Sequence, residues 1–406
     1  SIAIGFDAMK GSTRNSENIA IGAYAMDGTI TNASCTQNIA IGTRSMSGAL
    51  AGYHNTAVGD STMEAATSAF DNTALGFNAL NDLTTGDNNT AIGSGALAAN
   101  TTAANNVAVG KSSLAANTTG ASNIGIGASA LVSNTTAANN IAIGVSALNT
   151  NTTGTRNIGI GTDALYTNTA SDNLAIGYEA MKVTTTGHSN TAIGKGALDA
   201  HTTGDNNVAV GLDALGAQTT PGSNTAIGMT AGAAITTGGN NIMLGAGAGG
   251  SGTPGGTLTT GSNSVCIGND NISSANIQVD WTIASDARDK TDVEPLKIGL
   301  SFINQLEPIT YRWDKRSKYS NDQSIAPDGS HKEDWLDTGF LAQDVEKLEE
   351  EFGYQADNKT NLTTTLSGDG KMYGLTYSKF IPSLVKAVQE LSAEVEELKQ
   401  QLNQEE

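Results

Sequence analysis

The first 268 residues repeat one short alternation of hydrophobic and small residues. At residues 190–194 it reads Asn-Thr-Ala-Ile-Gly, and its closing glycine recurs from Gly5 to Gly268, most often at steps of 17 residues. In the copy at Ile19–Ile21, the two isoleucines share one face of a strand and the alanine lies on the other. A period this regular predicts a solenoid with one coil per repeat.

Each residue type of the repeat suggests a place in the coil. We expect the branched Ile or Val to fill a core and the small Ala to permit close approach on the opposite face. The glycine after each strand and the glycine of each Thr-Thr-Gly, such as Gly86, indicate corners. The recurrent asparagines favour turns and ladders of hydrogen bonds from coil to coil.

The pattern changes near residue 284, where the chain becomes dense in charge. Ile277, Val279, Trp281 and Ile283 alternate with polar residues and predict a half-buried strand. Further elements expected after it are a helix through Leu300, Ile303 and Leu306, a strand over Pro308–Trp313, and a strand that turns into a helix over Thr338–Glu346. The segment Tyr373–Ser378 then leads into the last element.

The last element has heptad spacing, which predicts a coiled coil over residues 380–402. β-Branched residues at one core position and Leu at the other favour two strands in isolated peptides, so three strands would require the preceding domain to impose the number. The alternative is a helix packed on its own domain. The core positions are Ile381, Leu384, Val388, Leu391, Val395, Leu398 and Leu402.

Charge and composition exclude several classes of function. The net charge is −19, which argues against nucleic acid or an anionic membrane as partner, and no apolar run approaches the roughly 20 residues of a membrane helix. The run Gly249–Gly256 lacks the Lys-Ser/Thr of a phosphate loop, and the acidic calcium-binding repeat of other β-rolls is absent. We therefore expect no metal and no cofactor.

Single residues of the array suggest little chemistry. Cys35 and Cys266 lie at opposite ends of the array, so we interpret both as packed residues and not as a disulfide. His54, His188 and His201 lie in polar segments and are expected to be solvated. A threefold ion site on a trimer axis, which needs only one such side chain per chain, is the alternative. Because the chain starts at Ser1, we expect it to be a fragment or a processed product.

The repeat resembles the head repeats of trimeric bacterial adhesins, whose signature reads much like Asn-Ile-Ala-Ile-Gly. The resemblance covers residues 1–268 and implies a left-handed parallel β-roll in which three chains pack side by side. This repeat is longer than the shortest forms in that family, so an extra outward loop per coil is expected. Such loops are Asp82–Asn88, Ala116–Ser122, Thr150–Arg156 and His201–Asn206.

Residues 285–402 resemble the endosialidase-type intramolecular chaperone domain that ends many phage tail fibres and tailspikes. The motifs are Ser-Asp-x-Arg-x-Lys, then Leu-x-Pro-x-x-Tyr-x-Trp, then Gly-Phe-Leu-Ala-Gln-Asp-Val-Glu, and finally Tyr-Ser-Lys-Phe-Ile-Pro-Ser-Leu. The resemblance implies a trimeric α+β domain that templates the β-structure before it and cuts itself off. The domains expected are therefore residues 1–268, a junction at 269–284, and 285–406.

The resemblance also implies residue roles. The scissile bond would be Ser285–Asp286, with Ser285 as nucleophile, Lys290 as general base, and Asp286 and Arg288 orienting the turn. Asp289 departs from the family, which usually has an apolar residue there. A serine needs an adjacent base, and a lysine serves as one only when burial favours its neutral form. The plain alternative for Ser285 is a turn or helix N-cap serine.

The sequence thus predicts a homotrimeric fibre of a phage tail or a related injection machine. Its partners would be a host cell-surface glycan or protein receptor and tail or baseplate proteins upstream of residue 1, and its place the virion tail fibre. Enzymatic activity would be limited to a single-turnover serine autopeptidase. The alternatives are a cell-surface trimeric adhesin, which needs a C-terminal membrane barrel, and a glycan-degrading tailspike, which needs paired carboxylates.

Overall fold

The computed structural model divides the chain into two compact units, and each is described by itself. The first comprises residues 1–248 with 259–267, and the second residues 249–258 with 268–406. The structure describes residues 1–11, 16–28, 35–48, 51–251, 253, 256–278, 282–320, 324–355, 361–367 and 370–405.

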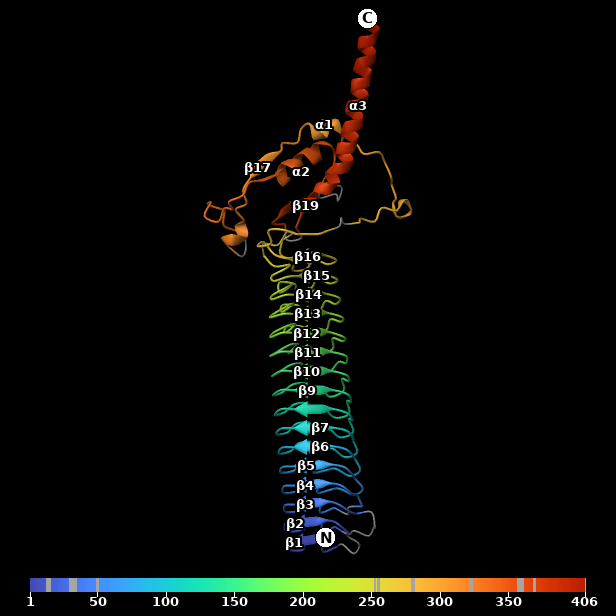
Figure 1. The fold of residues 1–406 in the computed structure, drawn as a ribbon, viewed down its shortest axis with the longest axis vertical. Coiled ribbons are helices and arrows are strands. Elements are labelled where there is room, and N and C mark those ends of the chain that lie inside the picture. The colour runs from blue at the N-terminus through green and yellow to red at the C-terminus, as the bar shows by residue number, and fades with distance from the viewer. Residues whose placement is uncertain are drawn as a thin grey trace. The chain divides into compact units, whose positions relative to one another are not determined.

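The first unit is a solenoid built on one parallel sheet of 16 strands that follow each other in sequence order (Figure 1). Equivalent residues of the repeat pair with each other, as Ala3 does with Ala20, which confirms one coil per repeat. Left-handedness and trimerisation stay predictions. The strands are β1 Ile2–Ile4, β2 Ile19–Ile21, β3 Ile39–Ile41, β4 Thr56–Val58, β5 Thr73–Leu75, β6 Thr90–Ile92, β7 Val107–Val109, β8 Ile124–Ile126, β9 Ile141–Ile143, β10 Ile158–Ile160, β11 Leu174–Ile176, β12 Thr191–Ile193, β13 Val208–Val210, β14 Thr225–Ile227, β15 Ile242–Leu244 and β16 Val265–Ile267.

The two faces of the strands are used in the opposite way to that expected. Ala20 is buried, whereas Ile19 and Ile21 are only partly buried. The same holds from β2 to β15, where the central residue, most often alanine, is buried and the flanking residues are partly or fully exposed. The end strands β1 and β16 are more exposed. The interior is completed by the Ala-Leu pair that follows each strand, such as Ala96 and Leu97. A coil this narrow has room for alanine beside leucine, so the branched residues are left on the outer face.

The glycine after each strand is required by both conformation and space. Gly22 has a φ of 136°, and a Cβ there would lie 2.4 Å from the carbonyl oxygen of Gly42 in the next coil. No side chain fits so close to a backbone oxygen, which explains why glycine recurs at the same place in every coil.

The asparagine before each strand forms the expected ladder. Asn55 donates from its side chain to Asn38 Oδ1 (3.0 Å) and to Ala69 O (2.8 Å), and its own Oδ1 accepts from Asn72 N (3.1 Å). These asparagines are buried, so the ladder satisfies polar groups that would otherwise be costly inside the coil.

The predicted outward loops are instead a wall of the coil, so that prediction is wrong. Between Leu80 and Asn89, every third residue is buried, namely Leu83 and Gly86 within the supposed loop. Equivalent buried positions in other coils are Asn117, Asn151 and His201. A segment in which every third side chain points into the coil forms part of the coil wall and does not project outward as a loop.

The second unit contains short strands and helices. Its elements are η1 Ala287–Asp289, α1 Leu300–Ile303, β17 Ile309–Tyr311, η2 Arg316–Lys318, β18 Asp337–Gly339, α2 Ala342–Glu351, β19 Thr364–Leu366, β20 Tyr373–Leu375, η3 Tyr377–Lys379 and α3 Phe380–Glu405. Strand β17 pairs with β18, and β19 with β20, both antiparallel.

These elements confirm most of the sequence expectations for the second unit and correct three. The helix expected to run to Leu306 ends at Ile303, and β19 was not expected. In the predicted strand 277–283, residues 279–281 lie outside the described residues. The flanking Ile277 and Ile283 are exposed, and neither belongs to a strand among the described residues. Most of the run Gly249–Gly256 is described without regular structure, and Gly252, Pro254 and Gly255 lie outside the described residues.

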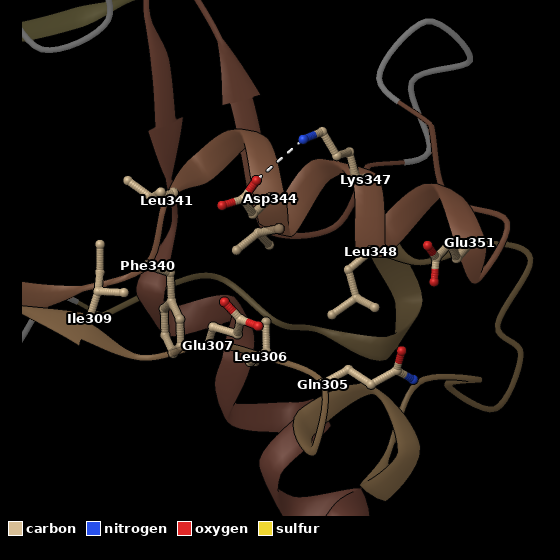
Figure 2. Close-up of a pocket in the computed structure, with 11 residues that line it drawn as sticks. Gln305, Leu306, Glu307, Ile309, Phe340, Leu341, Asp344, Lys347, Leu348 and Glu351 are labelled. Carbon is tan, nitrogen blue, oxygen red and sulfur yellow. Dashed lines mark hydrogen bonds and ion pairs between the residues drawn. The ribbon is translucent and has the colours of Figure 1, made fainter.

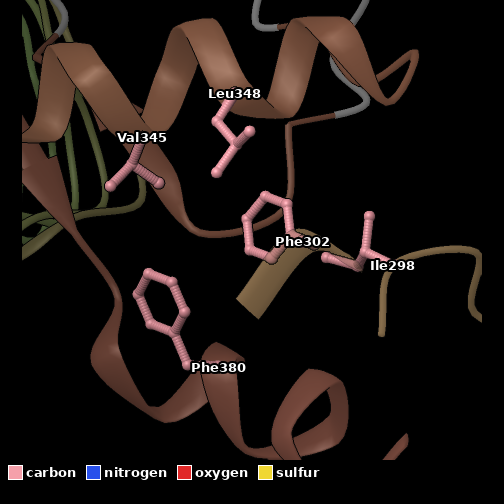
Figure 3. Close-up of a cluster of buried hydrophobic side chains, with 5 residues drawn as sticks. All are labelled: Ile298, Phe302, Val345, Leu348 and Phe380. Carbon is pink, nitrogen blue, oxygen red and sulfur yellow. The ribbon is translucent and has the colours of Figure 1, made fainter. Parts of the chain in front are cut away.

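The core of the second unit joins α1, α2 and the start of α3. Figure 3 shows Phe302, Val345, Leu348 and Phe380 converging from these elements, together with Ile298 from the segment before α1. Phe302 packs edge-on against Phe352 with ring centroids 5.5 Å apart. Helix α3 therefore begins as part of this core.

Helix α3 packs on its own domain through one face only. Phe380, Ser383 and Ala387 are buried, and Glu390 Oε2 accepts a hydrogen bond from Leu300 N at 2.6 Å, which satisfies an amide at the start of α1. Lys386 donates to the carbonyl oxygen of Leu296. These contacts hold the first three turns of α3 and leave the neighbouring face of the helix open.

Candidate functional site

The hexapeptide from Ser285 to Lys290 folds into a single tight turn. Helix η1 occupies its centre, and Lys290 closes it with a backbone hydrogen bond to the carbonyl oxygen of Ala287. The turn brings Lys290 Nζ to 2.6 Å from Ser285 Oγ, with the lysine donating. The nucleophile and base suggested by the sequence therefore lie in hydrogen-bonding contact, which is the geometry that a serine-lysine pair needs.

Asp286 and Arg288 hold the turn in shape. The Asp286 carboxylate accepts from the backbone nitrogen of Arg288 (2.9 Å) and pairs with its guanidinium, the closest N–O distance being 2.6 Å. The Arg288 guanidinium lowers the pKa of the Asp286 carboxyl, and the same pair raises the pKa of Arg288. Asp286 is thus the N-cap of η1, and the N-cap role considered for Ser285 falls to its neighbour.

The Ser285–Lys290 pair is exposed in the single chain. Residues 282–295 are all exposed, including Ile283 and Val293, which are 74% and 79% accessible. Lys290 Nζ is the donor in the hydrogen bond to Ser285 Oγ. The single chain therefore positions the two groups but does not bury them.

The histidines of the array do not behave alike. His54 is exposed and its ring nitrogens lie 3.1 Å from Asp71 Oδ1 and 2.5 Å from Gln37 Oε1. His188 is exposed as expected. His201 is fully buried, so the expectation that it is solvated is wrong. It occupies the inward position held by Asn151 three coils earlier, and this register is the signal that would have revealed it.

The cysteines are unpaired. Cys35 is buried beside Asn18 and Asn38, while Cys266 in β16 is partly exposed. Burial raises the pKa of both thiols. Within the described ranges, no three His, Cys, Asp or Glu side chains meet in a way that would hold a metal ion.

Figure 2 shows a pocket of about 400 Å³ between α2 and the segment that precedes β17. Leu306, Phe340 and Leu348 form apolar parts of its lining, and Asp344 pairs with Lys347 at 3.3 Å. Neither member of the Ser285–Lys290 pair lines it. The pocket therefore does not add to the candidate site.

The seven heptad core residues of α3 are all exposed in the single chain. They range from 41% accessible at Val395 to 65% at Leu402. The helix uses Phe380, Ser383 and Ala387 against its own domain, so the heptad face is a separate surface. Throughout the part of the chain that is described, no helix is long and apolar enough to cross a bilayer.

Contacts that sequence reasoning missed join the motifs of the second unit. Phe340 N donates to the hydroxyl oxygen of Tyr377 (3.2 Å), and Glu349, which is buried, accepts from Thr363 Oγ1 (2.5 Å) and Thr364 Oγ1 (2.7 Å). A buried carboxylate with three protein donors is a structural clamp between α2 and β19. No pattern in the sequence signals the partners of Glu349.

Comparison with known proteins adds one finding. Residues 285–354 match the model of a protein family described as chaperone of endosialidase. Comparisons with curated proteins and with solved structures gave no match. The matched segment begins at Ser285 and includes the whole Ser285–Lys290 turn, α1, β17, β18 and α2. The chain therefore carries a segment similar to this chaperone family, placed directly after a 16-strand β-solenoid.

Proposed function

We propose that the chain is a trimeric fibre protein of a phage tail or related injection machine that attaches to a host surface, and that its C-terminal chaperone drives trimer assembly and then cuts itself off at Ser285–Asp286. The observation that carries the cleavage proposal is the 2.6 Å contact between Lys290 Nζ and Ser285 Oγ in a segment similar to the chaperone family.

Two unpartnered surfaces support the trimer. The heptad face of α3 leaves Val388 and Leu391 63% and 49% exposed, and knobs-into-holes packing between copies would cover them. The outer face of the solenoid sheet repeats the same arrangement in every coil, with Ile92 and Ile193 each 37% exposed. Apolar surface that recurs at one place along so many coils favours a partner of matching length, which a second and third copy supply.

Assembly would also activate the cut. Burial of the turn between copies favours the neutral lysine, which then takes the Oγ proton of Ser285 as the oxygen attacks a peptide carbonyl. The lysine returns the proton to the leaving amide nitrogen, and water hydrolyses the ester. The exposure of the pair in the single chain explains why an unassembled chain would remain whole.

The position of the cut follows from ring size. Attack by Ser285 Oγ on its own carbonyl would close a strained four-membered ring, so cleavage of Ser285–Asp286 requires the Ser285 of another copy. Attack on the carbonyl of Ala284 within one chain closes a five-membered ring and would release a fragment that starts at Ser285. Intact mass of the C-terminal fragment distinguishes a start at Asp286, as proposed, from a start at Ser285, which would contradict transfer between copies.

The test is expression of the whole chain beside Ser285→Ala and Lys290→Ala. On a denaturing gel the parent should split into two bands and both variants should stay as one, while Lys297→Ala, an exposed lysine outside the turn, should split like the parent. Light scattering on the same samples should give a trimer mass. Unsplit parent protein would refute the cleavage, and a monomer mass for the uncleaved variants would refute the assembly.

Attachment is tested separately with the cleaved fibre. Fluorescently labelled protein should bind intact host cells, and a glycan array should show whether the receptor is a carbohydrate. Release of reducing ends from host polysaccharide would instead support the glycan-degrading alternative.

A further inference from the structure

The interior of the solenoid contains a second column of polar side chains besides the asparagine ladder. In four successive coils this column holds Asn100, Asn117, Asn134 and Asn151, followed by Asn168. Asn151 shows how the position is normally satisfied: its amide nitrogen donates to Gly154 O (2.9 Å) and its Oδ1 accepts from Gly154 N (3.0 Å). The side-chain amide of Asn151 therefore satisfies both backbone polar groups of Gly154, three residues further along the same coil.

Thr184 and His201 replace asparagine in the next two coils of this column. The register is fixed by the adjacent backbone, since Thr185 N donates to Thr202 O (2.9 Å). Both side chains are completely buried. One coil later Gln218 restores the amide, with Nε2 donating to Pro221 O (2.7 Å) and Oε1 accepting from Asn224 Nδ2 (3.1 Å). The irregularity is thus confined to two stacked positions.

The tautomer of His201 follows from its one hydrogen bond. Its Nε2 lies 2.7 Å from Gly204 O, and a carbonyl oxygen only accepts, so Nε2 carries the proton. Nδ1 is then a bare acceptor. It has no partner among the described residues, and neither does Thr184 Oγ1 directly below it in the column. The hydroxyl proton of Thr184 is therefore an unused donor beside an unused acceptor.

Threonine has a shorter polar arm than asparagine. In a regular coil the corner carbonyl accepts from two side chains, as Gly154 O does from Asn140 and Asn151. At the next-but-one corner Gly187 O accepts from Asn173 Nδ2 (2.7 Å) but receives nothing from Thr184. A hydroxyl on a two-atom side chain ends well short of this corner. A buried polar atom without a partner loses the hydrogen bonds that it made with water, so two such atoms in stacked coils are costly unless something else binds them.

We propose that an internal water-binding site lies between Thr184 and His201. One water molecule there donates a hydrogen bond to His201 Nδ1 and accepts one from Thr184 Oγ1. Water fits this chemistry because it both donates and accepts and because buried waters settle at pairs of otherwise unsatisfied polar groups. The third buried atom without a described partner, Asn100 Oδ1, lies five coils before Thr184 at the start of a run of asparagines and has no second unpartnered atom beside it.

The experiment uses the full chain labelled with ¹⁵N at its four histidines. Solid-state NMR should show His201 as the Nε2–H tautomer, with an Nδ1 shift typical of an acceptor that is hydrogen-bonded, and with magnetisation transfer from water. His201→Asn assigns the signal. Thr184→Val keeps the shape of the side chain but removes the hydroxyl, and should move the Nδ1 shift towards that of a free acceptor. Thr186→Val, at an exposed threonine two residues along the same coil, is the matched control and should leave it unchanged.

Three results would overturn the proposal: an Nδ1 signal without water transfer, an Nδ1 shift that Thr184→Val does not change, or a proton on Nδ1. A crystal structure that shows ordered waters gives an independent answer. A density peak within hydrogen-bonding distance of both atoms supports the site, and a direct bond between Thr184 Oγ1 and His201 Nδ1 refutes it.

Discussion

The hydroxyl oxygen of Tyr377 lies 3.2 Å from the backbone nitrogen of Phe340 and accepts its hydrogen bond. A Cβ on the preceding Gly339 would lie only 2.4 Å from the same hydroxyl oxygen. Only glycine at position 339 therefore leaves room for the hydrogen bond that joins the Gly-Phe-Leu-Ala-Gln motif to Tyr377, at the start of η3.

Gly339→Ala should destabilise the second unit by about 1–3 kcal/mol, because the added methyl group displaces Tyr377 from its position. Tyr377→Phe should cost less, about 1 kcal/mol, since it removes only one hydrogen bond. Urea unfolding followed by tryptophan fluorescence measures both, because all three tryptophans lie after residue 280.

Gly353→Ala is not a matched control, since its φ of 87° itself disfavours alanine. Lys332→Ala, on an exposed turn, is the suitable one, and a Gly339→Ala midpoint equal to it would contradict the steric argument.

Val388→Asp should abolish the oligomer that we propose while leaving the second unit folded. Val388 is 63% exposed on the heptad face, so the charge costs nothing in the single chain but would be buried between helices. Size-exclusion chromatography with light scattering should give monomer. Gln400→Asp, on the outer side of the same helix, is the control and should retain the parent mass. Assembly of the Val388→Asp chain at the parent mass would show that the heptad face is not the seam.

Acid should weaken the coils around His201. Burial lowers the pKa of its imidazole, against smaller opposing effects from Gly204 O and the nearby Asp205. The unfolded chain therefore binds a proton at a higher pH than the folded one, and stability falls as the pH drops from about 6.5 towards the folded value. Asp205 is the charged group that faces this ring.

Thermal midpoints measured from pH 8 to pH 4.5 check this effect. The parent should lose more stability over this range than His201→Asn, which carries the residue of the regular column. His188→Asn, at an exposed histidine, should follow the parent. Parallel curves for the parent and His201→Asn would contradict the prediction.

The last regular coils contain a compensating pair in their core. Gly232 stands where the preceding coils have leucine or methionine, and a Cβ there would lie 2.7 Å from Met243 Cε, which fills the space. Met243→Ala should therefore cost about 2–5 kcal/mol through the cavity it leaves. Gly232→Leu alone should also destabilise through overpacking.

The double variant restores the alanine and leucine of the regular repeat and should recover much of the loss. Hydrogen exchange of the amides in β14 and β15 measures the effect locally. Ala233→Ser, at the partly buried residue next to Gly232, is the control for the effect that any nearby substitution has on amide hydrogen exchange. Additive losses in the double variant would show that the two side chains do not compensate.

Much of the solenoid was determined by the sequence alone. A 17-residue period, glycine after each triplet and recurrent asparagine are local and repetitive signals, and the structure has one coil, one corner and one ladder position for each. The heptads of residues 381–402 likewise predicted the terminal helix, which the structure confirms, while its association into a coiled coil stays a prediction. These features can be predicted from sequence because the same steric and hydrogen-bonding constraints apply in every repeat.

Tertiary structure alone decided which side of each strand faces inward. Alternation separates Ala20 from Ile19 and Ile21 but does not say which set is enclosed, and the narrow interior selects the alanine. It also decided that His201 is buried, because only the stacking register places it in the asparagine column. The contact of Lys290 with Ser285 depends on the turn that Asp286 and Arg288 close, a three-dimensional arrangement that residue spacing permits but does not enforce.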